Sequence, residues 1–449
     1  MQQPKIQPPS INDLKAMFQV SGLKQKLIFT LLMMVVFRFC TQLPLFGINS
    51  TNFLNIAGGE NIIGFLDMFS GGALGKVSII ALGIGPYITS SIVMQLLAVV
   101  IPHLEQLQKE EGEAGRRKIA QYTRMFTVVV AIFQALVFVL FLTRNAQQAL
   151  LPNVNQPLFI IGSVCILTAG AVFTMWLAEL MTERGIGNGA SMIIFWGILS
   201  RIPFYFEKTA KIVSDNPALQ VGLIALLVIF FATMVLIVIM HEAARKVIIV
   251  NPKRQVGNKV YGGMNTYIPF KLNPGGVMPI IFAVAVLLFP TTVIELVGQS
   301  NLPAGPIRDT FLQLTAFFNA STLTYNAIYF LLIVLLTFFY ASIIPNMQPK
   351  EIANNLKKYG SSIPGIKPGR PTAEALDRIL SRVTLIGALG LGIIALIPSL
   401  AAKITNVTTL QGLGATSLII MVGVALDFLN QVKTHLLSKS YESFLKEKH

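Results

Sequence analysis

The feature that most constrains this chain is the recurrence of apolar runs long enough to cross a lipid bilayer. A helix that rises ~1.5 Å per residue needs about 20 residues to cross a hydrocarbon core ~30 Å thick. The run from Ala218 to Met240 meets this requirement without a charged residue. Ten such segments are expected, near residues 27–46, 77–101, 125–143, 158–180, 189–206, 218–240, 274–297, 326–345, 383–400 and 412–431.

The composition supports helices embedded in a membrane. Hydrophobic residues make up 53% of the 449 residues and charged residues only 12%, whereas a water-soluble domain needs a charged exterior. Strands of this composition would lack the polar inner face of a membrane barrel. The sequence therefore predicts an all-α integral membrane protein.

The lysines and arginines are distributed unevenly between the two sides of the predicted membrane. Of the 35 cations, 27 fall in the termini and the alternate loops on their side, 7 fall in the loops on the other side, and Arg38 lies inside a span. The positive-inside rule therefore places both termini in the cytoplasm. A cell inner (plasma) membrane is the default expectation, with a thylakoid membrane as the alternative. Attraction to anionic lipid headgroups accounts for part of this charge.

Two basic loops on the predicted cytoplasmic side are longer than the roughly 2–8 residues that usually join packed helices. The first covers residues 241–272, where alternation around Val260 and Tyr261 is typical of a short hairpin. The second covers residues 346–380 and contains a turn-rich tip from Pro364 to Pro371. Such tips can contact phosphate backbones or acidic protein patches. The candidate contact residues are Lys253, Arg254, Lys259, Lys357, Lys358, Lys367 and Arg370.

The motifs of enzymes and cofactor sites are not recognisable in this sequence. A stretch at His241 begins like a zinc-protease helix, but Arg245 stands where the second histidine is required. The glycine-rich stretch 185–189 joins two apolar segments rather than a strand and a helix, as a phosphate loop would. Cys40 and Cys165 lie in apolar spans, where a thiol usually acts as a small hydrophobe. We therefore expect no catalytic residue, no metal and no cofactor.

Two long stretches resemble the signatures of a known family. Residues 78–97 read SIIALGIGPYITSSIVMQLL, in which glycines and a proline weaken a membrane helix. Residues 176–194 read WLAELMTERGIGNGASMII and join the fourth and fifth spans. With shorter matches at 111–118, 364–369 and 440–443, these stretches resemble the SecY/Sec61-alpha family of protein-export channels over roughly residues 20–445.

The resemblance implies a clamshell of ten transmembrane helices in two inverted five-helix halves. The first half would be residues 1–206 and the second residues 207–449, with a hinge between the fifth and sixth spans. The spans at 77–101 and 274–297 would be the main helices of a lateral gate that opens toward lipid.

The resemblance also implies two seals in the channel. An apolar ring at the waist, which excludes water and ions by dewetting, would consist of Ile84, Ile88, Ile194, Ile281 and Ile420. Some relatives carry isoleucine at a further ring position, where this chain has Ala190. Each isoleucine taken alone is also consistent with ordinary helix packing. A glycine-rich half-helix at about 62–75, too short to span, would be a plug formed by Ile62, Phe65, Leu66, Met68, Phe69, Gly71 and Gly72.

The function that the resemblance implies is a passive conduit for unfolded preproteins, which releases hydrophobic segments sideways into lipid. The implied partners are the SecE and SecG subunits, the SecA motor ATPase, the ribosome through its RNA, signal peptides and preproteins, and membrane lipid. The family usually has arginine at the position of Lys367, and a lysine keeps the charge but loses the bidentate fork. Arg370 is a candidate to replace part of that contact.

Two other classes of protein fit part of the pattern. A secondary transporter of a small solute also has inverted halves and broken helices, but it needs a polar site near the midplane. Arg38 is the main ionisable residue deep in a span, so such a site is not evident. A membrane-embedded assembly factor could engage ribosomes through the basic loops, but it would have no use for a plug and an isoleucine ring.

Overall fold

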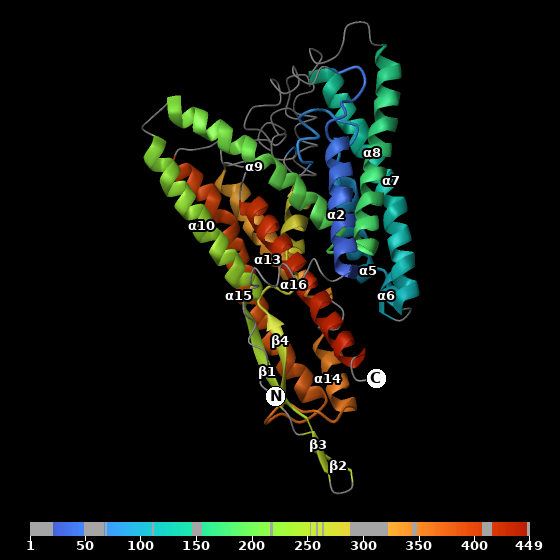
Figure 1. Ribbon diagram of the computed structural model, residues 1–449, viewed down its shortest axis with the longest axis vertical. Coiled ribbons are helices and arrows are strands. Elements are labelled where there is room, and N and C mark those ends of the chain that lie inside the picture. Colours follow the sequence, from blue (N-terminus) through green and yellow to red (C-terminus); the bar gives the residue numbers. More distant parts are fainter. Residues whose placement is uncertain are drawn as a thin grey trace, which may run out of the picture. The chain divides into compact units, whose positions relative to one another are not determined.

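The computed structural model shows a chain built mainly of helices (Figure 1). These helices follow the apolar runs, because a helix satisfies its backbone polar groups without water. The structure describes residues 21–48, 67, 70–109, 112–145, 155–215, 219–251, 253–256, 259–262, 265–287, 322–343, 348–405 and 415–446.

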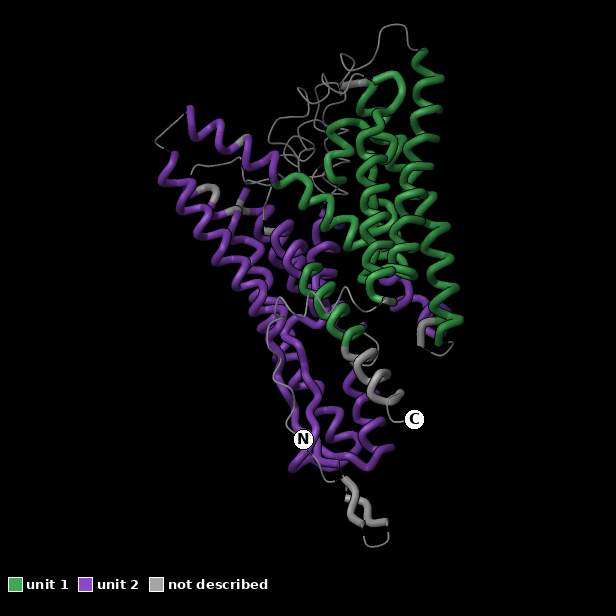
Figure 2. The backbone as a smooth tube through the Cα atoms, in the orientation of Figure 1, with its two compact units in different colours: residues 1–94, 107–202, 424–449 green, residues 95–106, 203–423 purple. Residues whose placement is uncertain are grey.

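The chain divides into two units, which Figure 2 shows in different colours. Unit 1 comprises residues 1–94, 107–202 and 424–449. Unit 2 comprises residues 95–106 and 203–423. Each unit is described by itself.

Unit 1 is a group of long helices. It contains α2 (Ser21–Cys40), most of α5 (Gly85–Val100), α7 (Gly112–Asn145), α8 (Gln156–Arg184), the first part of α9 (Gly189–Asp215) and the second part of α16 (Ala415–Lys446). α8 packs along α7 and also contacts α2. Its first turn contains Pro157. Backbone N–H groups in the first turn have no partner within the helix, so the missing N–H of proline costs no helical hydrogen bond. A buried cluster that includes Leu45, Val77, Val139 and Leu167 forms the core between these elements.

Unit 2 combines helices with a β-hairpin. Its complete helices are α10 (Gln220–Glu242), a short helix at Met278–Leu287, α13 (Leu323–Ile343), α14 (Pro349–Lys358) and α15 (Arg370–Thr405). It also contains the end of α5, most of α6 (Pro102–Lys109), the second part of α9 and the first part of α16. α15 packs against α10, α13 and α14. β1 (Ala244–Val250) pairs antiparallel with β4 (Asn265–Lys271), and β2 (Lys253–Val256) pairs antiparallel with β3 (Lys259–Gly262).

The hairpin, α14 and the start of α15 share an apolar core, to which Val247, Phe270, Leu356 and Leu376 contribute. Alternation along β1 buries Val247 and Ile249 and exposes Ile248. The hairpin predicted within residues 241–272 is therefore confirmed, and it is longer than expected. The expectation of an all-α chain is wrong for this loop, because its strands pair with each other and bury one face against α14 and α15.

Seven helices within the described residues are long and apolar enough to cross a membrane. They overlap seven of the ten expected spans, and each of the other three expected spans overlaps α2, α5 or the helix at Met278–Leu287. α5 and Met278–Leu287 are shorter apolar helices.

The second expected span begins later than the sequence indicated. We expected a helix from residue 77, but residues 77–84 form a series of turns and the helix begins at Gly85. Ser78 makes an antiparallel bridge with Pro44, and Gly83 has a φ of 55°. Backbone pairing with residues 43–45 and a left-handed glycine are incompatible with a helix here. The first span lies earlier in the chain than expected, since α2 begins at Ser21 and ends at Cys40.

Candidate functional site

Residues 70–84 form a buried segment of turns in unit 1 that crosses between α2, α8 and α9. Leu45 N–H donates to the carbonyl of Val77 at 2.8 Å, and Ile79 N–H donates to the carbonyl of Leu43 at 3.0 Å. Gly71 and Gly72 have φ values of 68° and 89°, a conformation that side chains disfavour. A Cβ on Gly71 would lie 3.0 Å from Cα of Gly197 in α9. Glycine is therefore required where the segment meets α9.

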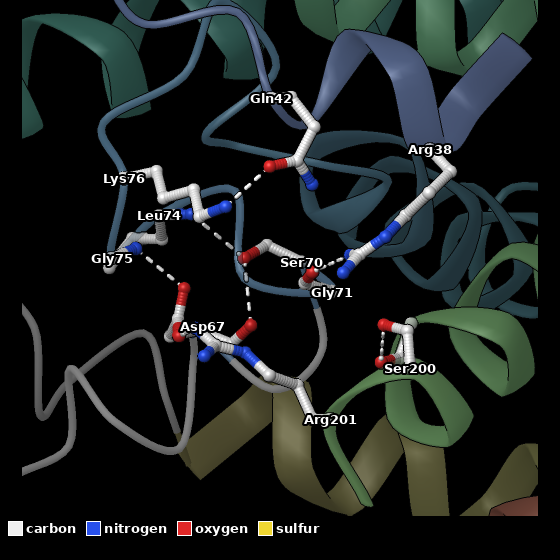
Figure 3. A network of polar contacts seen from close by, with 11 residues as sticks. Arg38, Gln42, Asp67, Ser70, Gly71, Leu74, Gly75, Lys76, Ser200 and Arg201 are labelled. Carbon is white, nitrogen blue, oxygen red and sulfur yellow. Dashed lines mark hydrogen bonds and ion pairs between the residues drawn. The ribbon is translucent and has the colours of Figure 1, made fainter. Parts of the chain in front are cut away.

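A network of charged and polar groups holds the start of this segment (Figure 3). Asp67 forms an ion pair with Arg201 of α9, and both side chains are largely buried. The Asp67 carboxylate also accepts a hydrogen bond from Gly75 N–H at 2.5 Å. Arg38 of α2 donates to the carbonyl of Gly71 at 2.6 Å. Two arginines from two helices therefore contact one short segment.

The predicted plug overlaps this segment only in part. Gly71 and Gly72 are buried and lie in the turns after Asp67. The other predicted plug residues lie outside the described residues; they are Ile62, Phe65, Leu66, Met68 and Phe69. The plug as a whole stays a prediction.

The five predicted ring isoleucines are divided between the two units. Ile84 directly precedes α5, Ile88 lies in its first turn, and Ile194 lies in α9, all in unit 1. Ile281 lies in the helix at Met278–Leu287, and Ile420 lies in α16, both in unit 2. All are buried except Ile88, which is half-buried. Their meeting in one ring stays a prediction.

The predicted basic contact residues all lie on one subdomain of unit 2. Lys357 and Lys358 are exposed in the last turn of α14, and Lys367 and Arg370 are exposed in the following turns. Arg370 forms an ion pair with Glu374, one helical turn on, at 3.1 Å. The other three candidates lie on β2 and β3, namely Lys253, Arg254 and Lys259.

The two basic loops are joined to each other. Val250, at the end of β1, makes a two-way backbone bridge with Ser362, in which both N–H groups donate at 2.9 and 3.1 Å. Beside it, Ser361 Oγ donates to Asn251 Oδ1 at 2.8 Å. The hairpin and the turns after α14 therefore form one surface, whereas the sequence analysis predicted two separate tips.

The glycine-rich loop between α8 and α9 is fixed by side chains from α2 and α16. Ile186 N–H donates to Thr30 Oγ1 at 3.1 Å, and Gly187 N–H donates to Gln431 Oε1 at 2.7 Å. A Cβ on Gly189 would lie 1.9 Å from the carbonyl oxygen of Ala178. This packing gives a structural reason for glycine in the second signature stretch.

The comparisons with known sequences are consistent along the whole chain. The SecY family model matches residues 78–429. A protein translocase subunit SecY from Synechococcus elongatus is 42% identical over 439 residues, which cover 96% of this chain and 96% of that protein.

The chain belongs to the SecY family.

A second member of the SecY family, from Aquifex aeolicus, is 41% identical over 442 residues, which cover 96% of this chain and 99% of that protein. Solved structures agree on the fold. A solved protein-conducting channel matches this chain with a TM-score of 0.65 at 18% identity, and the match covers 92% of this chain and 93% of that one. Sec61 in a canine ribosome-channel complex matches with a TM-score of 0.60 at 17% identity, covering 92% of this chain and 93% of that one.

The sequence analysis missed two pairs of charged residues in this SecY family member. It did not single out Asp67 or Arg201, which meet across unit 1. It also missed the pair in which Arg124 Nε of α7 donates to Glu179 Oε1 of α8 at 2.7 Å. Both pairs could have been suspected from the sequence, because ionisable residues in or beside apolar spans tend to pair with one another. Among the described residues, no group of three or more His, Cys, Asp and Glu side chains could hold a metal ion.

Proposed function

We propose that this chain is the pore-forming subunit of a protein translocase. The observation that carries the proposal is 42% identity to a protein translocase subunit over 96% of both chains. The fold of known protein-conducting channels supports it. In this function the chain is a passive conduit, so it needs no catalytic residue and no cofactor. Hydrophobic segments leave it sideways into lipid.

In this proposal the chain is a clamshell of ten transmembrane helices. Residues 1–206 and 207–449 are its two halves, and both termini lie in the cytoplasm. The charge distribution supports this orientation, because loops rich in lysine and arginine stay on the cytoplasmic side. The inner membrane of a bacterium is the favoured location; the cyanobacterial relative keeps a thylakoid membrane as the alternative.

The five isoleucines form the narrowest part of the channel. Four of the five are buried, and an apolar constriction excludes water and ions by dewetting. The segment that begins near residue 62 seals the channel on the non-cytoplasmic side. A solved relative supports this role, since the plug domain of that SecY protein stabilises the closed state of its translocation channel.

The joined surface of the two basic loops binds the partners that drive translocation. Exposed cations at Lys357, Lys358, Lys367 and Arg370 suit the phosphates of ribosomal RNA and acidic patches of a motor protein. The ribosome-bound Sec61 structure supports the first partner. The motor is SecA, and the small subunits SecE and SecG complete the complex.

The experiment that tests this function is transport of a radiolabelled preprotein into vesicles that contain the chain with SecE, SecG, SecA and ATP. We expect preprotein that is protected from added protease and is released when detergent opens the vesicles. Uptake of small solutes is measured on the same vesicles. Solute uptake without protected preprotein, with all partners functional, would overturn the proposal in favour of a secondary transporter.

A further inference from the structure

The strongest unexplained feature of unit 1 is a buried ion pair inside a membrane protein. The side chains of Arg201 and Asp67 are 14% and 11% exposed. Burial of two charges is costly, and an apolar pair of similar volume would usually stabilise a fold at least as well. Ionisable groups at such positions are rare and usually serve a function. Stability alone therefore does not explain this pair.

Asp67 accepts hydrogen bonds from the turns that follow it through both its carboxylate and its backbone carbonyl. Besides the Gly75 N–H bond to the carboxylate, the Asp67 carbonyl accepts from Gly72 N–H at 2.8 Å and from Ser70 Oγ at 2.9 Å. Ser70 Oγ in turn accepts from Leu74 N–H at 3.0 Å. Hydrogen bonds therefore tie the turns at residues 70–75 to Asp67 (Figure 3).

The glycines of the segment leave room for this pair. A Cβ on Gly72 would lie 2.8 Å from Nε of Arg201, and a Cβ on Gly75 would lie 3.0 Å from the carboxylate of Asp67. The guanidinium of Arg201 and the carboxylate of Asp67 therefore pack directly against the backbone of the segment. α9 carries Arg201, so the ion pair fastens the segment to a transmembrane helix.

We infer that the Asp67–Arg201 pair is a latch that holds Asp67 and the turns at residues 70–75 in the resting position, and that its opening is a step in channel opening. This inference rests on the proposed function. A pair of opposite charges weakens steeply when water comes between them. A polypeptide that enters the channel brings water with it, so it weakens the latch and frees the whole organised segment at once. Asp67 and Arg201 are positioning residues, because they act through the segment.

The test uses a reporter cysteine in the segment. Ala73 is 0% exposed, so a cysteine at this position reacts slowly with a water-soluble maleimide while the segment rests. Cys40 and Cys165 are replaced by alanine, and the full chain is placed in vesicles with its partner subunits. We expect Asp67→Asn and Arg201→Met each to raise the labelling rate about tenfold or more, because each leaves one buried charge without its partner.

The double variant Asp67→Asn/Arg201→Met separates a latch from a merely structural role. It removes both charges, so we expect a labelling rate closer to the parent than either single variant gives. Lys76→Met is the matched control, since Lys76 directly follows the segment and its hydrogen bond to Gln42 is exposed. We expect it to label at the parent rate. Arg201→Lys keeps a charge and is expected to fall between the parent and Arg201→Met.

Three results would overturn the latch. The single variants could label at the parent rate, the control could rise as much as they do, or the double variant could show the product of the two single effects. If Arg201→Met does not insert into the membrane, Asp67→Asn and Arg201→Lys give the same comparison. Preprotein transport by the parent is measured in parallel. Its failure would overturn the proposed function, while the labelling rates would still decide whether the pair holds the segment.

Discussion

At the scale of single residues, close backbone contacts explain glycines that composition alone leaves unexplained. α8 passes so near the segment before α5 that a Cβ on Gly170 would lie 2.0 Å from the carbonyl oxygen of Ile79. Gly162, two turns earlier in α8, has nothing within 4 Å of the same position. The two glycines therefore have different reasons to be present, although they share a helix.

Replacement of each glycine by alanine distinguishes the two cases. We expect Gly170→Ala to lower the free energy of unfolding by about 1–3 kcal/mol, because an extra methyl group in a packed site forces backbone shifts. Gly162→Ala is expected to be neutral or to raise it by up to ~1 kcal/mol, since alanine favours a helix. Denaturant unfolding of the detergent-solubilised chain measures both. Equal effects of the two variants would contradict the close approach at Gly170.

Among the helices and strands, the two basic loops at residues 241–272 and 346–380 are joined into one surface. The bridge between Val250 and Ser362 and the hydrogen bond between Ser361 and Asn251 link the hairpin to the turns after α14. The shared core of β1, β4, α14 and α15 supports this link. The basic residues of the two loops therefore belong to one subdomain, which in the proposed function suits a partner that binds both loops.

Loss of the side-chain hydrogen bond should loosen this link. We expect Ser361→Ala to destabilise the junction by about 1 kcal/mol, the usual net value of such a bond. Hydrogen exchange should then become faster at the amides of Val250 and Ser362. Ser342→Ala is the control, because the Ser342 hydroxyl only donates to the carbonyl of Phe338 within α13. Unchanged exchange in Ser361→Ala would show that the backbone bridge alone holds the loops.

At the scale of the whole molecule, the proposed channel needs both units, because Ile84 belongs to unit 1 and Ile281 to unit 2. We expect Ile84→Ser/Ile281→Ser to raise the ion conductance of the resting channel in planar bilayers, since hydroxyl groups favour water in a narrow constriction. Ile84→Leu/Ile281→Leu keeps the apolar surface and should stay closed. Serine variants that seal as well as the parent would rule these two residues out of the constriction.

The sequence by itself determined the membrane environment, the approximate positions of the helices, the hairpin and the family. These follow from local signals, because hydropathy, alternation and signature stretches are properties of neighbouring residues. Only the tertiary structure decided where α5 begins, since the turns before Gly85 exist through pairing with residues 43–45. It likewise decided that Asp67 meets Arg201 and that Val250 meets Ser362. Residues so far apart in the chain become partners through the packing of helices and strands, and no local pattern records which pairs will meet.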